Sequence, residues 1–278
     1  MNWRPFLRNA RVVFGVAVLL TLVVAALGAP WIAPFDPSDQ DLLNTFAKPF
    51  WLDGGAEFLL GTDSLGRDVL SRMIFSARAA LTVASIAALL AGLLGTTLGL
   101  IAGYYGGRLD TWISRLVEIW MSFPSVLLCI VLAAFLGAGL HTVVIAIIVI
   151  DWTRFCRVVR AEVQVQRELD YVASALTIGL SPRQILLKEV LPNVIPLLLT
   201  LFTLEMGIAI VVEAILSFVG LSSSGIPTWG SIIQEGRLYV HQAWWLMGLP
   251  TACIIVAVLG MNALGDGLRQ VLDPVRQR

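Results

Sequence analysis

The stretch at residues 173–193 reads ASALTIGLSPRQILLKEVLPN, and its helix-breaking residues set the local structure. Gly179 is suited to end one helix, because glycine readily adopts the left-handed conformation of a C-terminal cap. Ser181 can then cap a second helix in a capping box, with Pro182 as its first helical residue. Pro192 is expected to end that second helix. The stretch therefore predicts two short helices that meet at a glycine–serine elbow.

The second of these helices carries more apolar surface than its own packing needs. Ile185, Leu186 and Leu187 follow one another directly. Exposed apolar surface of this kind marks an interaction site. We therefore expect this helical corner to dock into another protein.

The rest of the chain is strongly apolar. Of 278 residues, 58% are hydrophobic and 14% are charged, whereas soluble domains contain about a quarter charged residues. Six runs with few or no charges are long enough to span a bilayer of about 30 Å. They cover residues 12–35, 79–107, 112–136, 142–159, 194–216 and 243–264. The chain is expected to be an all-α polytopic membrane protein with six transmembrane helices and the corner between spans four and five.

Two of these runs allow a second interpretation. The first could be a signal peptide, because its ALGA sequence resembles a cleavage site, but its length of about 24 residues favours a retained helix. The third and fourth could be one long helix. Their combined uncharged length exceeds what one tilted helix needs, so a hairpin that turns at residues 137–139 is favoured.

Six spans leave both termini on one side, and the basic residues indicate which side. With the N-terminus in the cytoplasm, few basic residues lie outside; these are Lys48, Arg67, Arg72, Arg78 and Arg237. The expected layout is a cytoplasmic N-terminus at 1–11 and a single transmembrane domain at 12–278, with extracytoplasmic segments at 34–78 and 217–242 and a cytoplasmic loop at 157–193.

Both extracytoplasmic segments contain a predicted helix. In the first, Thr62 or Asp63 can cap a helix that places Asp68 and Arg72 on one face. The second segment is expected to be a loop followed by a short amphipathic helix.

The sequence lacks the motifs of an enzyme. Lys48 and Lys188 follow alanine and leucine, so neither can belong to the Gly-Lys step of an ATP-binding P-loop. His141 and His241 lie on separate segments without an acidic or cysteine cluster. The cysteines have no metal-binding or disulfide spacing; they are Cys129, Cys156 and Cys253. We expect no catalytic role, no bound cofactor or metal, and no nucleic-acid partner.

Charged residues inside the predicted spans need a partner or water. Arg115 and Glu118 can pair on one helix face, and Asp151 and Arg154 offer the same spacing. Glu205 lies near the middle of the fifth span without a basic residue at helical spacing. It either faces a translocation cavity or is hydrogen-bonded at a helix contact.

The corner resembles the EAA loop in permease subunits of ABC importers, whose pattern is Glu-Ala-Ala, then a glycine and a later Leu-Pro. The residues at these positions are Ala173, Ser174, Ala175, Gly179, Leu191 and Pro192. Ala173 and Ser174 differ from the pattern, whereas the glycine and proline that shape the loop are present.

Further stretches, in the same order along the chain, resemble the C-type permease subunit of dipeptide, oligopeptide and nickel importers. They are LGTDSLGRDVLSR (60–72), GYYGGRLD (103–110), MSFPS (121–125), AILSFVGL (214–221), WGSIIQEGR (229–237) and GDGLRQVLDP (265–274). The resemblance covers essentially the whole chain after residue 12.

The resemblance implies a type I ABC-importer permease fold in the cytoplasmic (inner) membrane of a bacterium or archaeon. It implies a heterodimer with a second, homologous permease subunit, two cytoplasmic P-loop ATPases that hold ATP and Mg²⁺, and an extracytoplasmic solute-binding protein. Short peptides are the expected substrate. Nickel or a nickel chelate is the alternative within the family, which also serves glutathione-like thiols, and an ion-coupled secondary transporter is the more distant alternative.

The same resemblance assigns roles to particular residues. Coupling to the ATPase falls to the corner, through Ala173, Ser174, Ala175, Gly179, Ser181, Leu186, Leu191 and Pro192. Glu205 would lie on the translocation path.

Overall fold

The computed structural model describes residues 9–52, 54–221 and 225–272. In this part of the chain the secondary structure consists of helices joined by loops, with one isolated β-bridge between Thr62 and Asp68. Its α-helices are α2 (Ala10–Ile32), α3 (Val69–Tyr105), α4 (Gly107–Met121), α5 (Ser125–Leu136), α6 (Leu140–Arg167), α7 (Asp170–Thr177), α8 (Pro182–Ile185), α9 (Leu191–Phe218), α10 (Trp229–Gly236) and α11 (Trp245–Leu272). Short helical turns are η1 (Leu42–Asn44), η2 (Phe50–Leu52), η3 (Leu186–Val190) and η4 (Arg237–Tyr239). The predicted all-α class is confirmed.

Among the described residues, 4 helices are long and apolar enough to cross a membrane, by length and composition. They are α2, α3, the continuous stretch Pro182–Phe218, and α11. The pair α4 and α5 would add a fifth span, although the two helices meet at 84°. Pro124 precedes α5 and disfavours helical backbone at the residue before it. The third predicted span is therefore a bent pair and not one straight helix.

The fourth predicted span corresponds to α6, which is not among these apolar helices. Asp151, Arg154 and Arg157 lie in its central turns. The predicted hairpin before it is confirmed, because α5 ends at Leu136 and α6 begins at Leu140.

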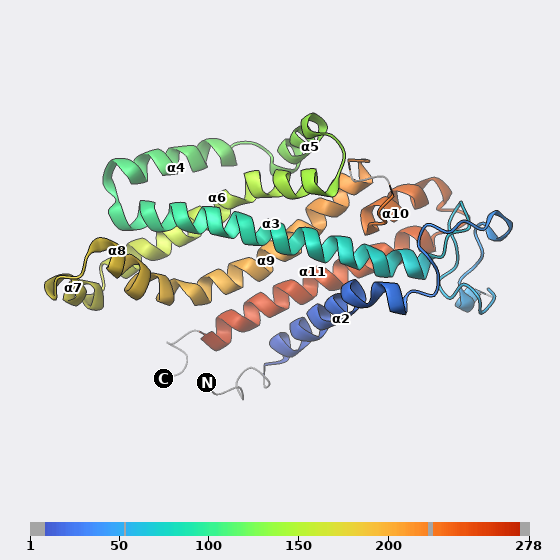
Figure 1. The fold of residues 1–278 in the computed structure, drawn as a ribbon, viewed down its shortest axis with the longest axis horizontal. Helices are drawn as coiled ribbons and strands as arrows, with labels where there is room; N and C mark the ends of the chain where they lie inside the picture. The colour runs from blue at the N-terminus through green and yellow to red at the C-terminus, as the bar shows by residue number, and fades with distance from the viewer. Residues whose placement is uncertain (1–8, 53, 222–224, 273–278) are drawn as a thin grey trace.

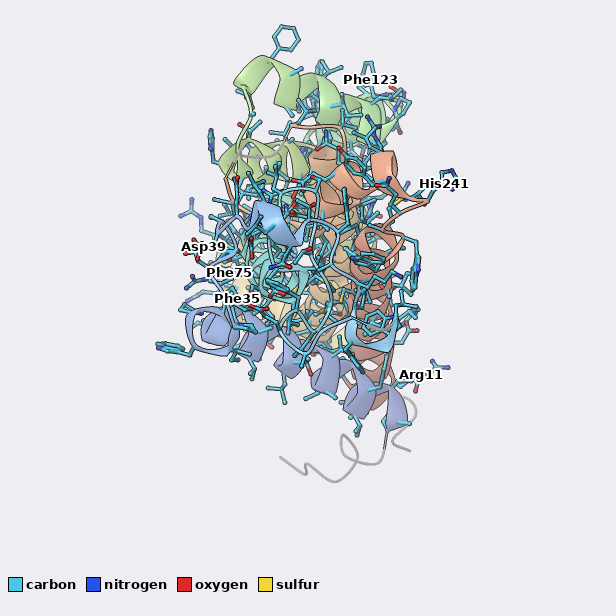
Figure 2. All side chains as sticks on the ribbon, turned by 90° about the vertical axis from the view of Figure 1, so that its right-hand side faces the viewer. Arg11, Phe35, Asp39, Phe75, Phe123 and His241 are labelled. Atoms are coloured by element: carbon cyan, nitrogen blue, oxygen red, sulfur yellow. The ribbon has the colours of Figure 1, made fainter. Side chains whose placement is uncertain are left out.

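The long helices run side by side between two ends of the molecule (Figure 1). We call one the terminal end; it holds the start of α2, the end of α11, the α3–α4 turn, and α7 and α8. We call the other the distal end; it holds the segment before α3 and α10. Figure 2 faces the distal end, and the exposed side chain of His241 projects from one side of the body.

The distal end is held by the short helix that the sequence predicts. Trp229 and Ile232 of α10 are buried, and the Trp229 indole donates a hydrogen bond to the Met73 carbonyl oxygen at 3.2 Å. Ile232 packs in a cluster with Met73 of α3 and with Trp245 and Leu246 at the start of α11. Helix α10 therefore joins α3 to α11.

Helices α3 and α6 approach closely through a row of glycines. A Cβ atom added at Gly95 would lie 2.2 Å from the Trp152 carbonyl oxygen, and one at Gly99 would lie 2.8 Å from that of Cys156. Residues four apart share one helix face, and small residues allow membrane helices to pack backbone to backbone. The row therefore places α6 against the C-terminal half of α3.

Gly95→Ala is expected to destabilise the protein by about 1–3 kcal/mol, the usual cost of overpacking. The new methyl group would meet the backbone of α6, which cannot move without shifting the whole helix. Gly92→Ala is the matched control, because its nearest neighbours are ring atoms of Phe155 at 3.3 Å. The melting temperature of the detergent-purified protein measures both. An equal loss of stability in both variants would contradict a tighter α3–α6 backbone contact at Gly95 than at Gly92.

Candidate functional site

The predicted elbow is present at the terminal end. Gly179 has a φ of 87° and follows α7. Its N–H donates to the Leu176 carbonyl oxygen at 3.0 Å, and the Leu180 N–H donates to that of Ala175 at 3.2 Å. These two bonds form the Schellman motif that ends a helix at a left-handed glycine.

The second helix begins with the predicted capping box. The Ser181 side chain accepts a hydrogen bond from the Gln184 N–H, and the Gln184 side chain accepts one from the Ser181 N–H. Pro182 is the first helical residue. The elbow therefore forms from local backbone preferences, as the sequence predicts.

The predicted end of this helix before Pro192 is wrong. Residues 186–190 form a π-helical turn, in which the Leu191 N–H donates to the Leu186 carbonyl oxygen, and the chain continues directly into α9. A proline inside an α-helix removes one hydrogen bond and clashes with the carbonyl four residues earlier. The wider π turn precedes Pro192, which then stands in the first turn of α9, where its missing N–H needs no partner. The second helix of the corner and α9 are thus one continuous helical stretch, Pro182–Phe218.

The apolar residues of the corner divide into a buried and an exposed set. Ile185 and Leu186 are 0% and 8% exposed, so the prediction that they form the docking surface is wrong. They pack in a cluster with Val159, Val163 and Val172. The exposed apolar residues, which we call the corner surface, are Leu176, Ile178 and Leu187.

The residues assigned to coupling are likewise divided between surface and interior. Ala175 and Leu186 are buried and Leu191 is partly buried. The exposed members are Ala173, Ser174, Gly179, Ser181 and Pro192. The buried members hold the shape of the corner, whereas the exposed members and the corner surface are open to contact from outside the chain.

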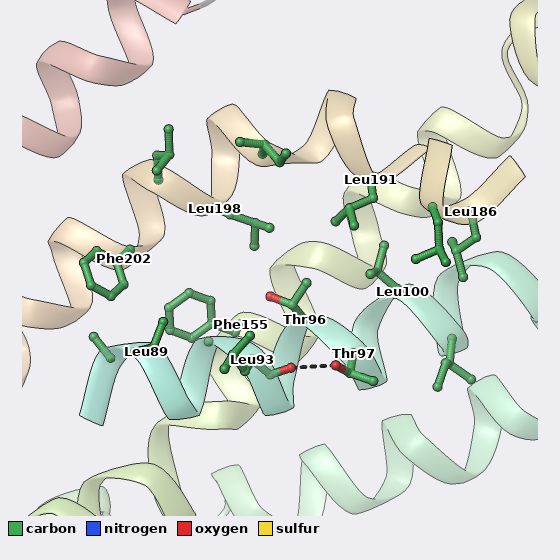
Figure 3. A pocket seen from close by; sticks show the side chains of 16 residues that line it. Leu89, Leu93, Thr96, Thr97, Leu100, Phe155, Leu186, Leu191, Leu198 and Phe202 are labelled. Carbon is green, nitrogen blue, oxygen red and sulfur yellow. Dashed lines mark hydrogen bonds between the residues drawn. The ribbon is translucent and has the colours of Figure 1, made fainter. Parts of the chain in front are cut away.

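An apolar groove of about 480 Å³ lies beside the corner, between α3 and α9 (Figure 3). Leu93 and Leu100 line it from α3, Leu198 and Phe202 from α9, and Leu186 from the corner. The second helix of the corner and α9 therefore line the same side of the groove and belong to one continuous helical stretch.

Glu205 is buried at a helix contact, with 1% of its surface exposed. Its Oε2 atom accepts a hydrogen bond from Nη1 of Arg154 on α6 at 3.1 Å. The Arg154 Nη2 atom lies 3.6 Å from Oδ1 of Asp151, which confirms that predicted pair. Arg154 retains 39% side-chain exposure, so the guanidinium and not the Glu205 carboxylate reaches the surface. Sequence spacing missed this partner because it comes from another helix.

A second group of buried and partly buried charges, which we call the distal network, joins the segment before α3 to α10. Arg72, whose side chain is 3% exposed, donates hydrogen bonds to Asp63 and to both carboxylate oxygens of Glu235. Arg67 bridges the same two acids, at 2.7 Å from each. The network therefore fixes the loop before α3 on α10.

The expected cap of α3 is wrong. Helix α3 begins at Val69 and is capped by Asp68, which accepts a hydrogen bond from the Ser71 N–H at 2.7 Å. Asp63 instead belongs to the distal network, and Arg72 pairs with it and not with Asp68.

Comparison with known proteins places this architecture in a family. Residues 95–278 match the family described as binding-protein-dependent transport system inner membrane component. Residues 1–49 match the N-terminal TM domain of oligopeptide transport permease C.

Curated relatives match along nearly the whole chain. A di/tripeptide transport system permease protein of Pseudomonas aeruginosa is 39% identical, over 98% of this chain and 90% of its own length. A dipeptide transport system permease protein of Haemophilus influenzae is 37% identical, over 98% and 93%. A glutathione transport system permease protein of Pectobacterium atrosepticum is 35% identical, over 98% and 89%.

A solved structure of the MetNI methionine ABC transporter, in an inward-facing conformation, has a similar fold. The TM-score is 0.61 at 18% identity, with 73% of this chain and 97% of that chain covered. The inner membrane components of this transport family do not hydrolyse ATP, because ATP binds to partner ATPase subunits. The chain therefore belongs to the family of binding-protein-dependent transport system inner membrane components, the permease subunits of ABC transporters.

Proposed function

We propose that this chain is one of two permease subunits of an ABC importer that moves short peptides across the bacterial inner membrane. The observation that carries this proposal is the similarity, along almost the entire chain, to permeases named for di/tripeptide and dipeptide transport. The partners are a second, homologous permease, two cytoplasmic ATPases and an extracytoplasmic binding protein.

In this proposal α6 crosses the membrane together with the other long helices, which makes six crossings. It runs between the same two ends as its neighbours (Figure 1). Its charged residues Asp151 and Arg154 face Glu205 of α9, and a charge in a membrane is tolerated when it pairs within the protein. Six crossings leave both termini in the cytoplasm, with the corner.

The corner supports a mechanism for coupling. The corner surface would sit in a groove on one ATPase, and ATP-driven closure of the ATPases would displace it. Ile185 and Leu186 pack into the permease, and the corner continues into α9 without a break. ATP binding at one site therefore shifts the population of inward-open and outward-open states at another. The distal end, with the segment before α3 and α10, would receive the binding protein.

The first test is mild detergent extraction of the tagged chain from its native membranes, followed by mass spectrometry. We expect a second permease, one or two P-loop ATPases and a binding protein. Reconstitution of these partners in proteoliposomes should give uptake of a labelled dipeptide that requires both ATP and the binding protein.

Each other outcome points to a specific alternative. ATP-dependent uptake of nickel without peptide uptake would show that nickel, and not a short peptide, is the substrate. Recovery of the chain alone, active in ion-gradient-driven uptake, would replace the proposal by a secondary transporter.

A further inference from the structure

Helix α4 touches the rest of the molecule along one narrow face. Val117 is the buried residue of this fully described helix. Asp110 binds Arg160 of α6, and the Trp120 indole donates to the Val149 carbonyl oxygen at 2.6 Å. The remainder of α4 is largely free of contacts with its own chain.

The exposed part of α4 has two flanks of opposite character. Residues three or four apart lie on the same side of a helix. One flank is apolar and consists of Leu109, Trp112, Leu116 and Ile119. The other is polar and consists of Arg108, Thr111, Arg115 and Glu118. The apolar flank suits lipid, whereas the polar flank does not.

The polar flank lies at the depth of the hydrocarbon core if α6 crosses the membrane. The contacts of Asp110 and Trp120 set α4 beside residues 149–160 of α6. These residues include the middle of a 28-residue helix, which is about 42 Å long at 1.5 Å per residue. Arg115 and Glu118 pair at 3.0 Å, yet their side chains are 72% and 63% exposed. Charges at this depth are unfavourable against lipid, so they face water or protein.

The polar flank continues onto α6. A small hollow between the two helices is lined by Glu118 from α4 and by Arg157 and Arg160 from α6. Arg154, further along α6, is partly exposed. We call the exposed and partly exposed charged residues on this side of the two helices the charged stripe; they are Arg115, Glu118, Arg154 and Arg157.

Within the charged stripe, Arg157 differs from the other cations. Arg115 pairs with Glu118, and Arg154 pairs with Asp151 and Glu205. Arg157 is exposed and has no ion-pair partner among the residues that the structure describes. Its guanidinium is therefore available to an external anion.

We propose that the charged stripe is the wall that this chain contributes to the translocation path, and that Arg157 contacts the carboxylate of the passing substrate. The proposal rests on the proposed function, in which a second permease completes the path. A guanidinium binds a carboxylate by charge-assisted hydrogen bonds, often two in parallel. Every peptide with a free C-terminus carries such a group, whatever its side chains.

Cysteine accessibility tests the wall without reference to a substrate. The native cysteines, which are Cys129, Cys156 and Cys253, are first replaced by alanine. Glu118→Cys and Ile119→Cys are then compared in the assembled transporter with a charged, membrane-impermeant thiol reagent. We expect rapid labelling at 118 and little at 119, because adjacent residues point to different flanks. Equal labelling at both positions, or none at 118, would overturn the wall assignment.

Peptide uptake tests the role of Arg157. Arg157→Gln should raise KM about tenfold for a dipeptide with a free carboxylate, but leave KM for its C-terminal amide unchanged. Arg157→Lys should retain most of the affinity. Arg269→Gln, at an exposed arginine on α11, is the matched control.

The two possible failures can be distinguished. An equal change in KM for acid and amide would overturn the role of Arg157. Absence of peptide uptake by the unaltered transporter would instead contradict the proposed function, and the labelling experiment would still decide where the wall lies.

Discussion

Ile178→Asp is expected to abolish transport-coupled ATP hydrolysis while leaving the chain inserted in the membrane and paired with its partner permease. Ile178 is 79% exposed at the tip of the corner and lies just before the Gly179 cap. Full burial of an isoleucine stabilises by about 1.5–3 kcal/mol, and an unpaired carboxylate buried in its place adds a further cost. A loss of about 3 kcal/mol weakens docking more than about a hundredfold.

The measurement is ATP hydrolysis stimulated by the loaded binding protein in proteoliposomes, together with retention of the ATPases in a pull-down. Ile178→Leu keeps the apolar surface and should behave like the unaltered chain. Leu238→Asp, at a residue 72% exposed near α10, should retain the ATPases. Normal coupling in Ile178→Asp would exclude the tip of the corner from the contact.

Leu186 would be a poor site for the same test. Its side chain is 8% exposed and packs in the cluster below the corner. A charge there would unfold the corner itself, so loss of coupling would not show which surface docks. Substitutions at exposed positions of the corner therefore test docking, whereas substitutions at buried positions test the stability of the corner.

Arg72→Met is expected to destabilise the distal end by about 3–5 kcal/mol, the usual effect of removing one partner of a buried ion pair. The side chains of Arg72 and Asp63 are 3% and 1% exposed. Without the guanidinium, Asp63 and Glu235 retain Arg67 as their remaining partner, at 2.7 Å from each. The buried Asp63 and the partly exposed Glu235 would then share one cation. The melting temperature and the protease sensitivity of the segment before α3 report this loss.

Two variants separate the ion pairing from the volume of the side chain. Arg67→Met should cost less, because Arg67 is 18% exposed and more strongly screened by water. Combining Asp63→Asn with Arg72→Met should recover part of the stability, since it removes the unpaired charge together with its partner. A loss below about 1 kcal/mol in Arg72→Met would place this network in the range of surface ion pairs.

The corner shows which structural features can be predicted from residues that are close together in the sequence. The Gly179 cap and the Ser181 capping box were predictable because each depends on backbone preferences within a few residues. The continuation through Pro192 was not predictable, because it depends on a π turn. That turn allows Leu186 and Val190 to pack in the cluster with Val159 of α6.

The charged groups show the same distinction. The pairs Arg115–Glu118 and Asp151–Arg154 follow from spacing on one helix, and both are present. The partner of Glu205 lies 51 residues away, and Arg72 and Glu235 are 163 residues apart. No periodicity connects such positions, since the contact exists only after the helices have packed.

The amino-acid sequence by itself determined the all-helical class, most of the apolar spans, the elbow of the corner and the family resemblance. Each of these depends on composition or on spacing within a few turns of helix. The tertiary structure alone decided which apolar side chains of the corner point outward, which acids find a cation, and where α4 and α5 bend. These features depend on contacts between segments that are distant in the sequence. Such contacts form, and stabilise the fold, only when the helices are closely packed.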